Sequence, residues 1–150
     1  MKLIADGGST STKWALIDGS SIEFFNSKGL NLHYISELEV VDALIELKSK
    51  LKKPVTAIYF YGSGITSEYY RKQLIALLKE YINLEAKIFI DTDLIAACRA
   101  LFGNEEGIAG ILGTGAATCH FDGSRIKSRI PSLGFWLGDE GSGADLGKRL

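Results

Sequence analysis

Residues 6–12 read Asp-Gly-Gly-Ser-Thr-Ser-Thr, and this stretch stands between two short apolar segments, Lys2–Ala5 and Thr12–Ile17. Both segments have the composition of β-strands, so the glycine-rich stretch is predicted to be the turn between them. Glycines let a backbone approach a phosphate group closely, and the N–H groups and hydroxyls of such a turn can donate hydrogen bonds to it. A carboxylate at the exit of the preceding strand, here Asp6, can hold Mg²⁺ directly or through water. A plain Gly-Gly hairpin with a solvated aspartate is the alternative interpretation, and no Gly-Lys-Ser/Thr of a Walker loop follows.

The segments after this hairpin alternate between strand and helix patterns. A third strand is expected at Ile22–Ser27, and a helix begins at Ser36, which forms a capping-box pattern with Glu39, and ends before Pro54. The next elements are a strand at Val55–Tyr61, a helix at Glu68–Ile82, a strand at Ala86–Ile90 and a helix that ends near Phe102. This order, β-β-β-α-β-α-β-α, predicts an α/β layer with a mixed sheet.

The opening pattern recurs about 105 residues later. Gly7–Thr12 (GGSTST) matches Gly113–Thr118 (GTGAAT), and Ile17–Ser20 (IDGS) matches Phe121–Ser124 (FDGS). The repeat predicts a first lobe over residues 1–105 and the beginning of a second, incomplete lobe over residues 106–150. Its elements would be strands at Gly107–Leu112, Ala117–Phe121 and Arg125–Ile130, then a helix from near Gly143. Two glycine turns facing each other could clamp a polyphosphate from both sides.

Two further stretches place acids where ligands commonly bind. Asp91-Thr92-Asp93 joins a buried strand to a helix, and the carboxyl ends of strands are the usual ligand sites of open α/β sheets. Asp91 or Thr92 can cap that helix, while the Asp93 carboxylate can accept a proton from a substrate hydroxyl. Residues 134–143 (GFWLGDEGSG) enclose two acids between glycines, and Ser142 can cap the helix that follows. A loop without a function is the alternative interpretation of this last stretch.

Composition limits the classes of partner. Lys and Arg number 17 against 18 Asp and Glu, so the chain has no basic excess with which to bind nucleic acid. The apolar runs are too short to span a bilayer, and we expect no membrane partner. The two cysteines, Cys98 and Cys119, have no disulfide or metal-ligand spacing, which favours the reducing cytoplasm. The sequence is compatible with a homodimer but does not specify one.

Four segments, in this order, resemble the N-acetylglucosamine kinase family: DGGSTSTKW, DTDLIAACRALFG, GIAGILGTGA and GFWLGDEGSGADLGKRL. That family is related to the BadF/BadG and BcrA/BcrD-type ATPases within the sugar kinase, Hsp70 and actin superfamily. The resemblance runs over the whole chain and covers about the first half of a family member. It implies a ribonuclease H-like (actin-like ATPase) lobe followed by the start of a second similar lobe. It also implies an ATP-dependent kinase that phosphorylates the 6-hydroxyl of N-acetylglucosamine or a related hexosamine.

The resemblance also implies roles for individual residues. Asp6 would face Mg²⁺, Asp93 would be the catalytic base, and Asn31 and Asp139 would bind the amino sugar. The phosphates of ATP would lie against Gly7, Gly8, Ser9 and Thr10 of the first turn and Gly113, Thr114, Gly115 and Ala116 of the second, and Thr114 and Gly115 would also line the sugar. Three residues depart from the family pattern, namely Lys13, Ala116 and Leu133.

Two other functions compete with the kinase. The first is an ATPase that activates a dehydratase through a bridging iron–sulfur cluster, which needs a cysteine pair facing a partner. Cys98 and Cys119 show no sign of that placement in the sequence. The second is a sugar-binding protein without catalysis.

Overall fold

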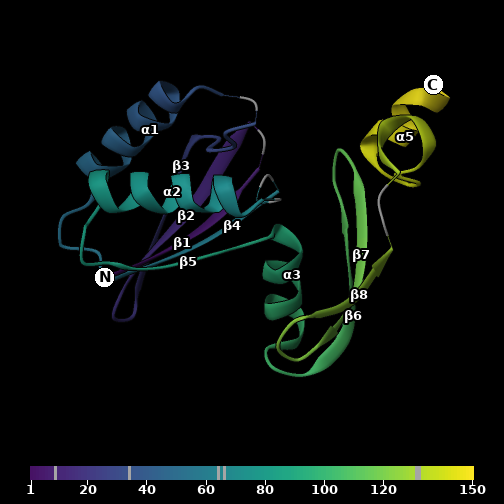
Figure 1. The fold of residues 1–150 in the computed structure, drawn as a ribbon. Helices are drawn as coiled ribbons and strands as arrows, with labels where there is room; N and C mark the ends of the chain where they lie inside the picture. The colour runs from purple at the N-terminus through teal and green to yellow at the C-terminus, as the bar shows by residue number, and fades with distance from the viewer. Residues whose placement is uncertain (9, 34, 64, 66, 131–132) are drawn as a thin grey trace. The chain divides into compact units, whose positions relative to one another are not determined.

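The computed structural model describes residues 1–150 except Ser9, Tyr34, Gly64, Thr66, Pro131 and Ser132 (Figure 1). The described chain forms two compact units, Met1–Asp93 and Leu94–Leu150. In the part of the chain that is described, no helix is long and apolar enough to cross a membrane.

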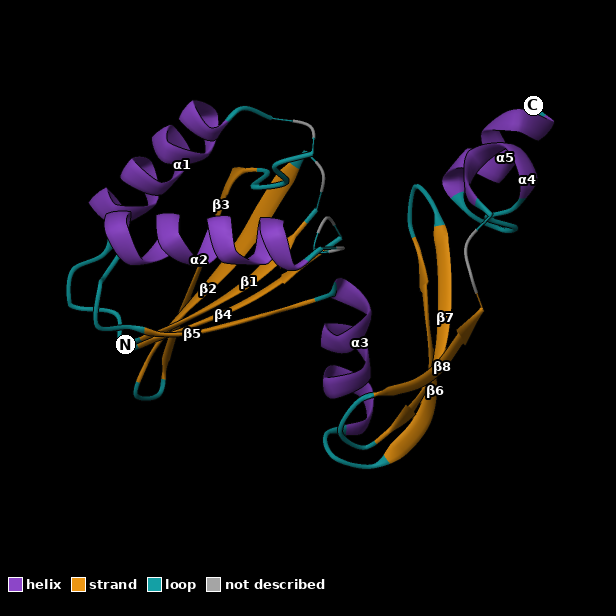
Figure 2. Ribbon diagram, in the orientation of Figure 1, coloured by secondary structure: helices purple, strands orange, loops and turns teal. Residues whose placement is uncertain are grey.

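The first unit is built on a five-stranded mixed sheet in the order β3-β2-β1-β4-β5 (Figure 2). Its first three strands form an antiparallel meander, and the last two run parallel to β1, as the element order predicted. The strands are β1 (Lys2–Gly7), β2 (Ser11–Asp18), β3 (Ser21–Lys28), β4 (Ala57–Gly62) and β5 (Lys87–Asp91), and the helices are α1 (Glu37–Lys50) and α2 (Glu68–Tyr81).

Both helices of the first unit cover the same face of the sheet. Residues alternate between buried and exposed along β1, so that Leu3 and Ala5 enter the core while Lys2, Ile4 and Asp6 do not. The apolar faces of both helices are buried in that one core, with Val40, Leu44 and Leu47 from α1 and Leu74, Leu77 and Leu78 from α2. Burial of each such leucine stabilises the fold by about 1.5–3 kcal/mol. The helices therefore cover one face of the sheet, and the carboxylate of Asp6 lies on the opposite face.

Phe60 explains why two neighbouring strands end in glycine. A Cβ added to Gly7 would lie 2.6 Å from Phe60 Cζ, and one added to Gly62 would lie 2.7 Å from Phe60 Cε1. The ring is held in turn by Trp14, whose ring centroid is 6.2 Å away and whose indole N–H donates to Ser27 Oγ at 2.9 Å. The backbones at the ends of β1 and β4 thus approach an aromatic ring as closely as only glycine allows.

The second unit repeats the opening meander of the first. β6 (Glu106–Leu112), β7 (Ala116–Asp122) and β8 (Ile126–Ile130) form an antiparallel sheet in the order β6-β7-β8. The helix α3 (Asp93–Phe102) packs on one face of this sheet, where Ala109, Cys119 and Phe121 are buried. The Sγ atoms of Cys98 and Cys119 lie 3.4 Å apart as free thiols, and burial raises the pKa of Cys98 to about 11. The cysteines therefore meet in the core, a contact that their sequence spacing did not indicate.

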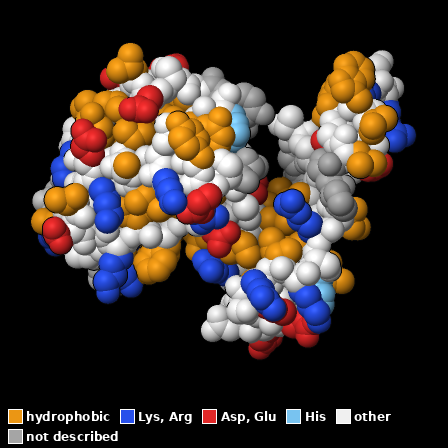
Figure 3. All heavy atoms as spheres, viewed as in Figure 1, with side chains coloured by type: hydrophobic (Ala, Val, Ile, Leu, Met, Phe, Trp, Pro, Cys, Tyr) orange, Lys and Arg blue, Asp and Glu red, His pale blue; other side chains and the backbone are white. Residues whose placement is uncertain are grey.

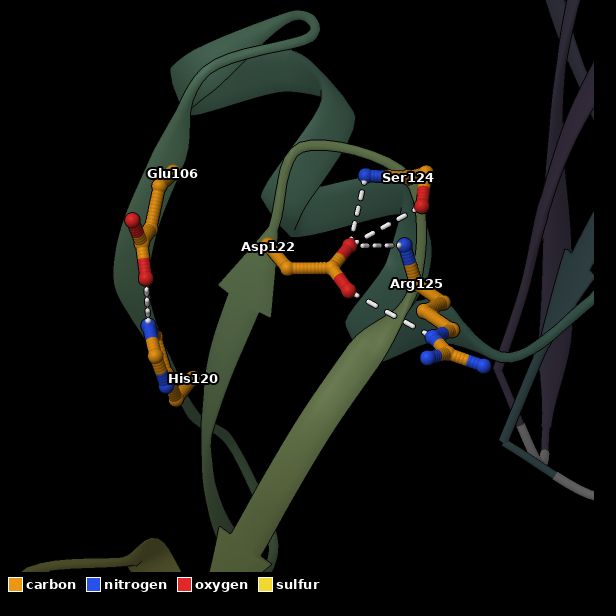
Figure 4. Close-up of polar contacts among 5 residues, drawn as sticks. All are labelled: Glu106, His120, Asp122, Ser124 and Arg125. Carbon is orange, nitrogen blue, oxygen red and sulfur yellow. Dashed lines mark hydrogen bonds and ion pairs between the residues drawn. The ribbon is translucent and has the colours of Figure 1, made fainter.

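The Asp-Gly-Ser turn between β7 and β8 is held by its own side chains (Figure 4). The Asp122 carboxylate accepts from the Ser124 N–H at 3.0 Å, the Ser124 hydroxyl at 2.9 Å and the Arg125 N–H at 2.9 Å. These donors hold the pKa of Asp122 well below its usual range, the Arg125 N–H having the largest effect. Nearby, His120 Nε2 lies 2.6 Å from Glu106 Oε1 and links β7 to β6. Both groups lie at the end of β7 away from Gly113–Gly115, so we regard them as structural.

Two boundaries differ from the simple sequence pattern. The compact units divide after Asp93, because α3 packs on the second unit, whereas the repeat places the lobe boundary after residue 105. The compact units are defined by contacts in the structure, whereas the predicted lobes are defined by the sequence repeat. The division after Asp93 therefore does not test the predicted lobe boundary, which stays a prediction. A one-turn helix, α4 (Gly134–Leu137), precedes α5 (Gly143–Arg149). The sequence pattern predicted α5 but not α4, since four residues between two glycines are too few to show a helical period.

We expect Gly62→Ala to lower the free energy of unfolding by about 1–3 kcal/mol, because the new methyl group must displace the Phe60 ring. Gly147→Ala is the matched control. A Cβ there has nothing within 4 Å, and alanine favours a helix over glycine by about 0.5–1 kcal/mol. Urea denaturation followed by circular dichroism measures both changes. A Gly62→Ala protein as stable as the parent would show that Phe60 does not require glycine.

Candidate functional site

The carboxyl ends of three parallel strands bring two acids into one row. The register of the sheet pairs Asp6 with Tyr61, and Tyr61 with Asp91. Paired residues project from the same face of a sheet, and neighbouring strands lie about 4.8 Å apart, so the Asp6 and Asp91 backbones are separated by about 10 Å. Lys13 stands opposite Asp6 on the other side, on β2. Asp6 is therefore exposed at a strand end with a cation beside it.

Asp93 lies at the start of α3, two residues beyond the end of β5. The N–H of Thr92 donates to Asp91 Oδ1 at 2.9 Å, so Asp91 supports the strand-to-helix connection. Asp93 falls in the first turn of the helix, where the helix dipole favours a negatively charged side chain. The two acids thus have different surroundings: Asp91 accepts a hydrogen bond in the connection, and Asp93 lies in the helix. The sequence did not decide between these arrangements.

The first glycine turn is closed by backbone hydrogen bonds. The Gly8 N–H donates to Ser11 O at 2.9 Å, and the Gly29 N–H, from the chain after β3, donates to Thr10 O at 3.0 Å. The Gly8 amide is thus used to hold the turn, while the Thr10 side chain is exposed to solvent. Ser9, the remaining predicted phosphate contact of this turn, lies outside the described residues.

Asn31 lies beside this turn and lines a small hollow with Gly7, Gly8 and Tyr70. The hollow has a volume of about 10 Å³, enough for about one water molecule. Asn31 Oδ1 accepts from the His33 N–H at 3.0 Å, which leaves the amide NH₂ as its donor group. The His33 ring packs on Tyr70, with 4.0 Å between ring centroids. The structure therefore brings Asn31 close to the glycine turn, and its predicted role in sugar binding stays a prediction.

The second glycine turn is fastened to the start of α5. The Gly113 N–H donates to Gly115 O at 2.9 Å, and the N–H groups of Gly143 and Ala144 donate to Gly113 O and Thr114 O at 2.8 and 3.1 Å. These two amides are among the N–H groups that a helix leaves unpaired at its N-terminus, so the turn satisfies them. The Thr114 side chain is exposed.

The N-terminus of α5 is also capped by its own side chains. Ser142 is fully buried, and its Oγ accepts from the Asp145 N–H at 3.1 Å. The Asp145 carboxylate accepts from the Gly141 N–H at 2.9 Å, and this bond, helped by Arg149, lowers the pKa of Asp145 below its usual value. The cap fixes the loop that carries Asp139.

Asp139 lies directly against the second turn. A Cβ on Gly115 would be 3.1 Å from Asp139 Oδ2, so glycine at position 115 allows the carboxylate to approach. The backbone of Asp139 has a φ of 62°, which is rare for a residue other than glycine and marks a constrained conformation. Asp139, Glu140, Ala116 and Leu133 line a hollow of about 320 Å³. The second unit thus gathers the five residues predicted for it: Gly113, Thr114, Gly115, Ala116 and Asp139.

Sequence reasoning missed two residues that stand in these sites. Tyr61 lies between Asp6 and Asp91 in the sheet, and Tyr70 lines the hollow beside Asn31. Glu140, one of the two acids noted in residues 134–143, lines the hollow beside Asp139 without an assigned role. Tyr61 could have been found from the sequence, because it lies near the end of a predicted strand, as Asp6 does. Tyr70 lies on the apolar face of α2 and gives no signal in the sequence.

Scans with models of protein families and a search of curated proteins return no match. Among solved structures, a proposed N-acetylglucosamine kinase from Porphyromonas gingivalis is 38% identical, with a TM-score of 0.82 over 99% of this chain and 54% of that one. Over nearly its whole length, the chain is therefore similar to a proposed N-acetylglucosamine kinase. It spans about half the length of these relatives.

Two more distant structures share the fold of this chain. A proposed N-acetylglucosamine kinase from Chromobacterium violaceum is 21% identical, with a TM-score of 0.76 over 99% of this chain and 54% of that one. A ROK family glucokinase from Streptomyces griseus, in complex with glucose and AMPPNP, is 15% identical, with a TM-score of 0.56 over 84% and 46%. The expected fold is confirmed: an actin-like α/β lobe with a mixed sheet, followed by part of a second similar lobe.

Proposed function

We propose that the complete protein is an ATP-dependent sugar kinase that phosphorylates the 6-hydroxyl of N-acetylglucosamine or a related hexosamine. The observation that carries this proposal is the repeated site. In each unit, a glycine turn joins the first two strands of the meander, and the chain after the third strand is hydrogen-bonded to that turn. The likeness to the Porphyromonas gingivalis protein supports the same function.

The residues of the two turns fit ATP and Mg²⁺. Asp6 offers an exposed carboxylate, the type of oxygen ligand that Mg²⁺ prefers. Exposed hydroxyls of Thr10 and Thr114 can donate to phosphate oxygens, together with turn amides that are not used to close the turns. When bound, Mg²⁺ would neutralise charge on the phosphates during transfer. Lys13, opposite Asp6 in the sheet, adds a positive charge near the same edge.

Asp93 is proposed as the general base. Its carboxylate would accept the proton of the sugar 6-hydroxyl as that oxygen bonds to the γ-phosphorus, while the bond from the γ-phosphorus to the β–γ bridging oxygen breaks and ADP leaves. A position in the first turn of α3 favours the ionised carboxylate, which is the form that can accept the proton.

Asn31 and Asp139 would orient the sugar by complementary hydrogen bonds. The NH₂ of the Asn31 amide can donate, while the Asp139 carboxylate can accept from a hydroxyl or an amide N–H. A site that pairs hydroxyls with buried polar groups discriminates strongly against analogues that lack them.

The structure disfavours the dehydratase activator. Both cysteines are buried, with exposed fractions of 0% for Cys98 and 3% for Cys119, and they face each other. Neither thiol is therefore available to bind a cluster shared with a partner. A sugar-binding protein without catalysis remains as an outcome of the experiment that follows.

We expect phosphorus NMR to show a sugar 6-phosphate when the protein from the complete reading frame is mixed with MgATP and N-acetylglucosamine. A panel with glucosamine and glucose identifies the preferred sugar. Release of free phosphate without a sugar phosphate from any of them would indicate an ATPase. Sugar binding without nucleotide turnover would contradict the kinase and leave a binding protein.

Asp93→Asn should reduce kcat by about 10²–10⁴-fold, because the amide cannot accept the proton. The sugar dissociation constant, measured by calorimetry, should change by only a few-fold, since the variant keeps the size and shape of the side chain. Asp42→Asn, on the exposed surface of α1, is the matched control and should retain the parent kcat. A kcat within tenfold of the parent would remove Asp93 as the base.

Gly115→Ala should raise the KM for the sugar about tenfold, because its Cβ would displace the Asp139 carboxylate and weaken a hydrogen bond to a charged group. A double-mutant cycle tests this cause. In an Asp139→Gly background, where a positive φ is tolerated and no carboxylate remains, Gly115→Ala should add little to the KM. Additive effects would show that Gly115 acts independently of Asp139.

A further inference from the structure

The connection between β3 and α1 holds the Asn31 side chain in one orientation. Asn31 Oδ1 accepts from the His33 N–H at 3.0 Å, and the Asn31 carbonyl oxygen accepts from the Ile35 N–H at 3.2 Å. Asparagine side chains in turns commonly accept from the backbone two residues later in this way. Because the amide oxygen is bonded inside the connection, the direction of the Asn31 NH₂ group depends on where the His33 backbone lies.

The His33 ring packs on a tyrosine of α2. Its centroid lies 4.0 Å from that of the Tyr70 ring, and the two ring planes are inclined by 54°. Figure 3 shows a histidine at the surface of the first unit, next to hydrophobic side chains. Aromatic rings that pack at an angle attract each other beyond the effect of the area that they bury. The contact therefore joins the connection that carries Asn31 to α2.

Tyr70 stands at a fixed point of the first unit. Its N–H donates to the Oγ of the capping residue Ser67 at 3.3 Å, and the Tyr69 ring packs edge-on against its ring with 5.4 Å between centroids. Leu74, one turn further along α2, is buried in the core. The helix α2 therefore offers the His33 ring a support that is anchored in the core.

The hollow that Tyr70 and Asn31 line is too small for a sugar. Its volume is about 10 Å³, enough for about one water molecule, whereas pockets for small ligands have about 300–1,000 Å³. The buried apolar residues Phe60, Ile65 and Leu74 also line it. The Tyr70 ring therefore occupies the space beside Asn31, and a sugar would have to approach the Asn31 NH₂ group from outside the hollow.

We propose that His33 and Tyr70 are positioning residues for the sugar. Their ring contact holds the His33 backbone, and the His33 N–H in turn holds the Asn31 amide with its NH₂ group directed to a sugar hydroxyl. The inference rests on the proposed function, in which Asn31 binds the sugar. It adds that the affinity for the sugar depends on an aromatic ring at position 70. The Tyr70 hydroxyl has no part in this role, so phenylalanine should serve as well as tyrosine.

Steady-state kinetics of the protein from the complete reading frame tests the inference. Tyr70→Ala should raise the KM for the sugar about 3- to 10-fold, as loss of one aromatic contact predicts, and leave kcat and the KM for ATP within about twofold of the parent. Tyr70→Phe should restore the parent KM. His33→Ala removes the same contact from the exposed side and should reproduce the effect, also where Tyr70→Ala fails to fold.

Tyr81→Ala is the matched control, because it removes a partly exposed tyrosine about 16 Å further along the same helix. Its KM for the sugar should equal that of the parent. An equal rise of KM in Tyr81→Ala would show a general loss of packing, and an equal rise in Tyr70→Phe would show that the hydroxyl is what matters. Either result, or an unchanged KM in Tyr70→Ala, would overturn the inference.

A double-mutant cycle and amide exchange separate this inference from the proposed function. In an Asn31→Ala background, Tyr70→Ala should change the KM for the sugar by less than about twofold, because its effect passes through Asn31. Without any substrate, the His33 N–H should exchange with solvent at least about threefold faster in Tyr70→Ala than in the parent. Unchanged exchange in an active kinase would overturn the inference alone. Faster exchange with an unchanged KM would contradict the role of Asn31 in the proposed function, and the inference with it.

Discussion

The site depends on backbone hydrogen bonds that fasten a distant loop to each glycine turn. Gly29 donates to Thr10 O in the first unit, and Gly143 and Ala144 donate to the carbonyls of Gly113 and Thr114 in the second. A turn of glycine and small hydroxyl residues has little side-chain bulk, so a second backbone can reach its carbonyl groups. These bonds bring Asn31 and Asp139, each far from its turn in sequence, close to the glycine turn of their own unit. Loss of the close approach would separate these polar side chains from the turns.

Local signals in the sequence were sufficient for most of the fold. Ser36 with Glu39 marked the start of α1, and the structure shows both hydrogen bonds of that capping box. The Asp-Gly-Ser turns marked the second hairpin of each meander. An aspartate side chain in such a turn can accept hydrogen bonds from the backbone N–H groups of the turn, as Asp122 does. The residues that make up each of these signals lie within a few positions of one another, so they can be recognised in a single sequence.

Contacts between segments that are distant in the sequence could not be predicted from such local signals. The contact between Cys98 and Cys119 joins a helix to a strand, and neither residue has a spacing that indicates the other. The close approach of Asp139 to Gly115 depends on a left-handed residue and on the buried cap at Ser142. The sequence marked both segments as unusual, but only the fold shows that the carboxylate lies where a side chain at position 115 would point. Residues 113–116 and 139 were linked in advance by the family resemblance and not by any local rule.

Asp93 occupies a position that both units influence. It follows β5, which the parallel sheet of the first unit holds in register with β4, and it begins α3, whose buried residues belong to the core of the second unit. Phe102 at the other end of α3 lies so close to Gly107 that a Cβ there would be 2.6 Å from its ring, and Cys98 contacts Cys119 midway. The helix is therefore fixed to the second unit along its length, while the strand before it is fixed to the first. The position of Asp93 therefore depends on a strand of the first unit and on a helix that packs in the second.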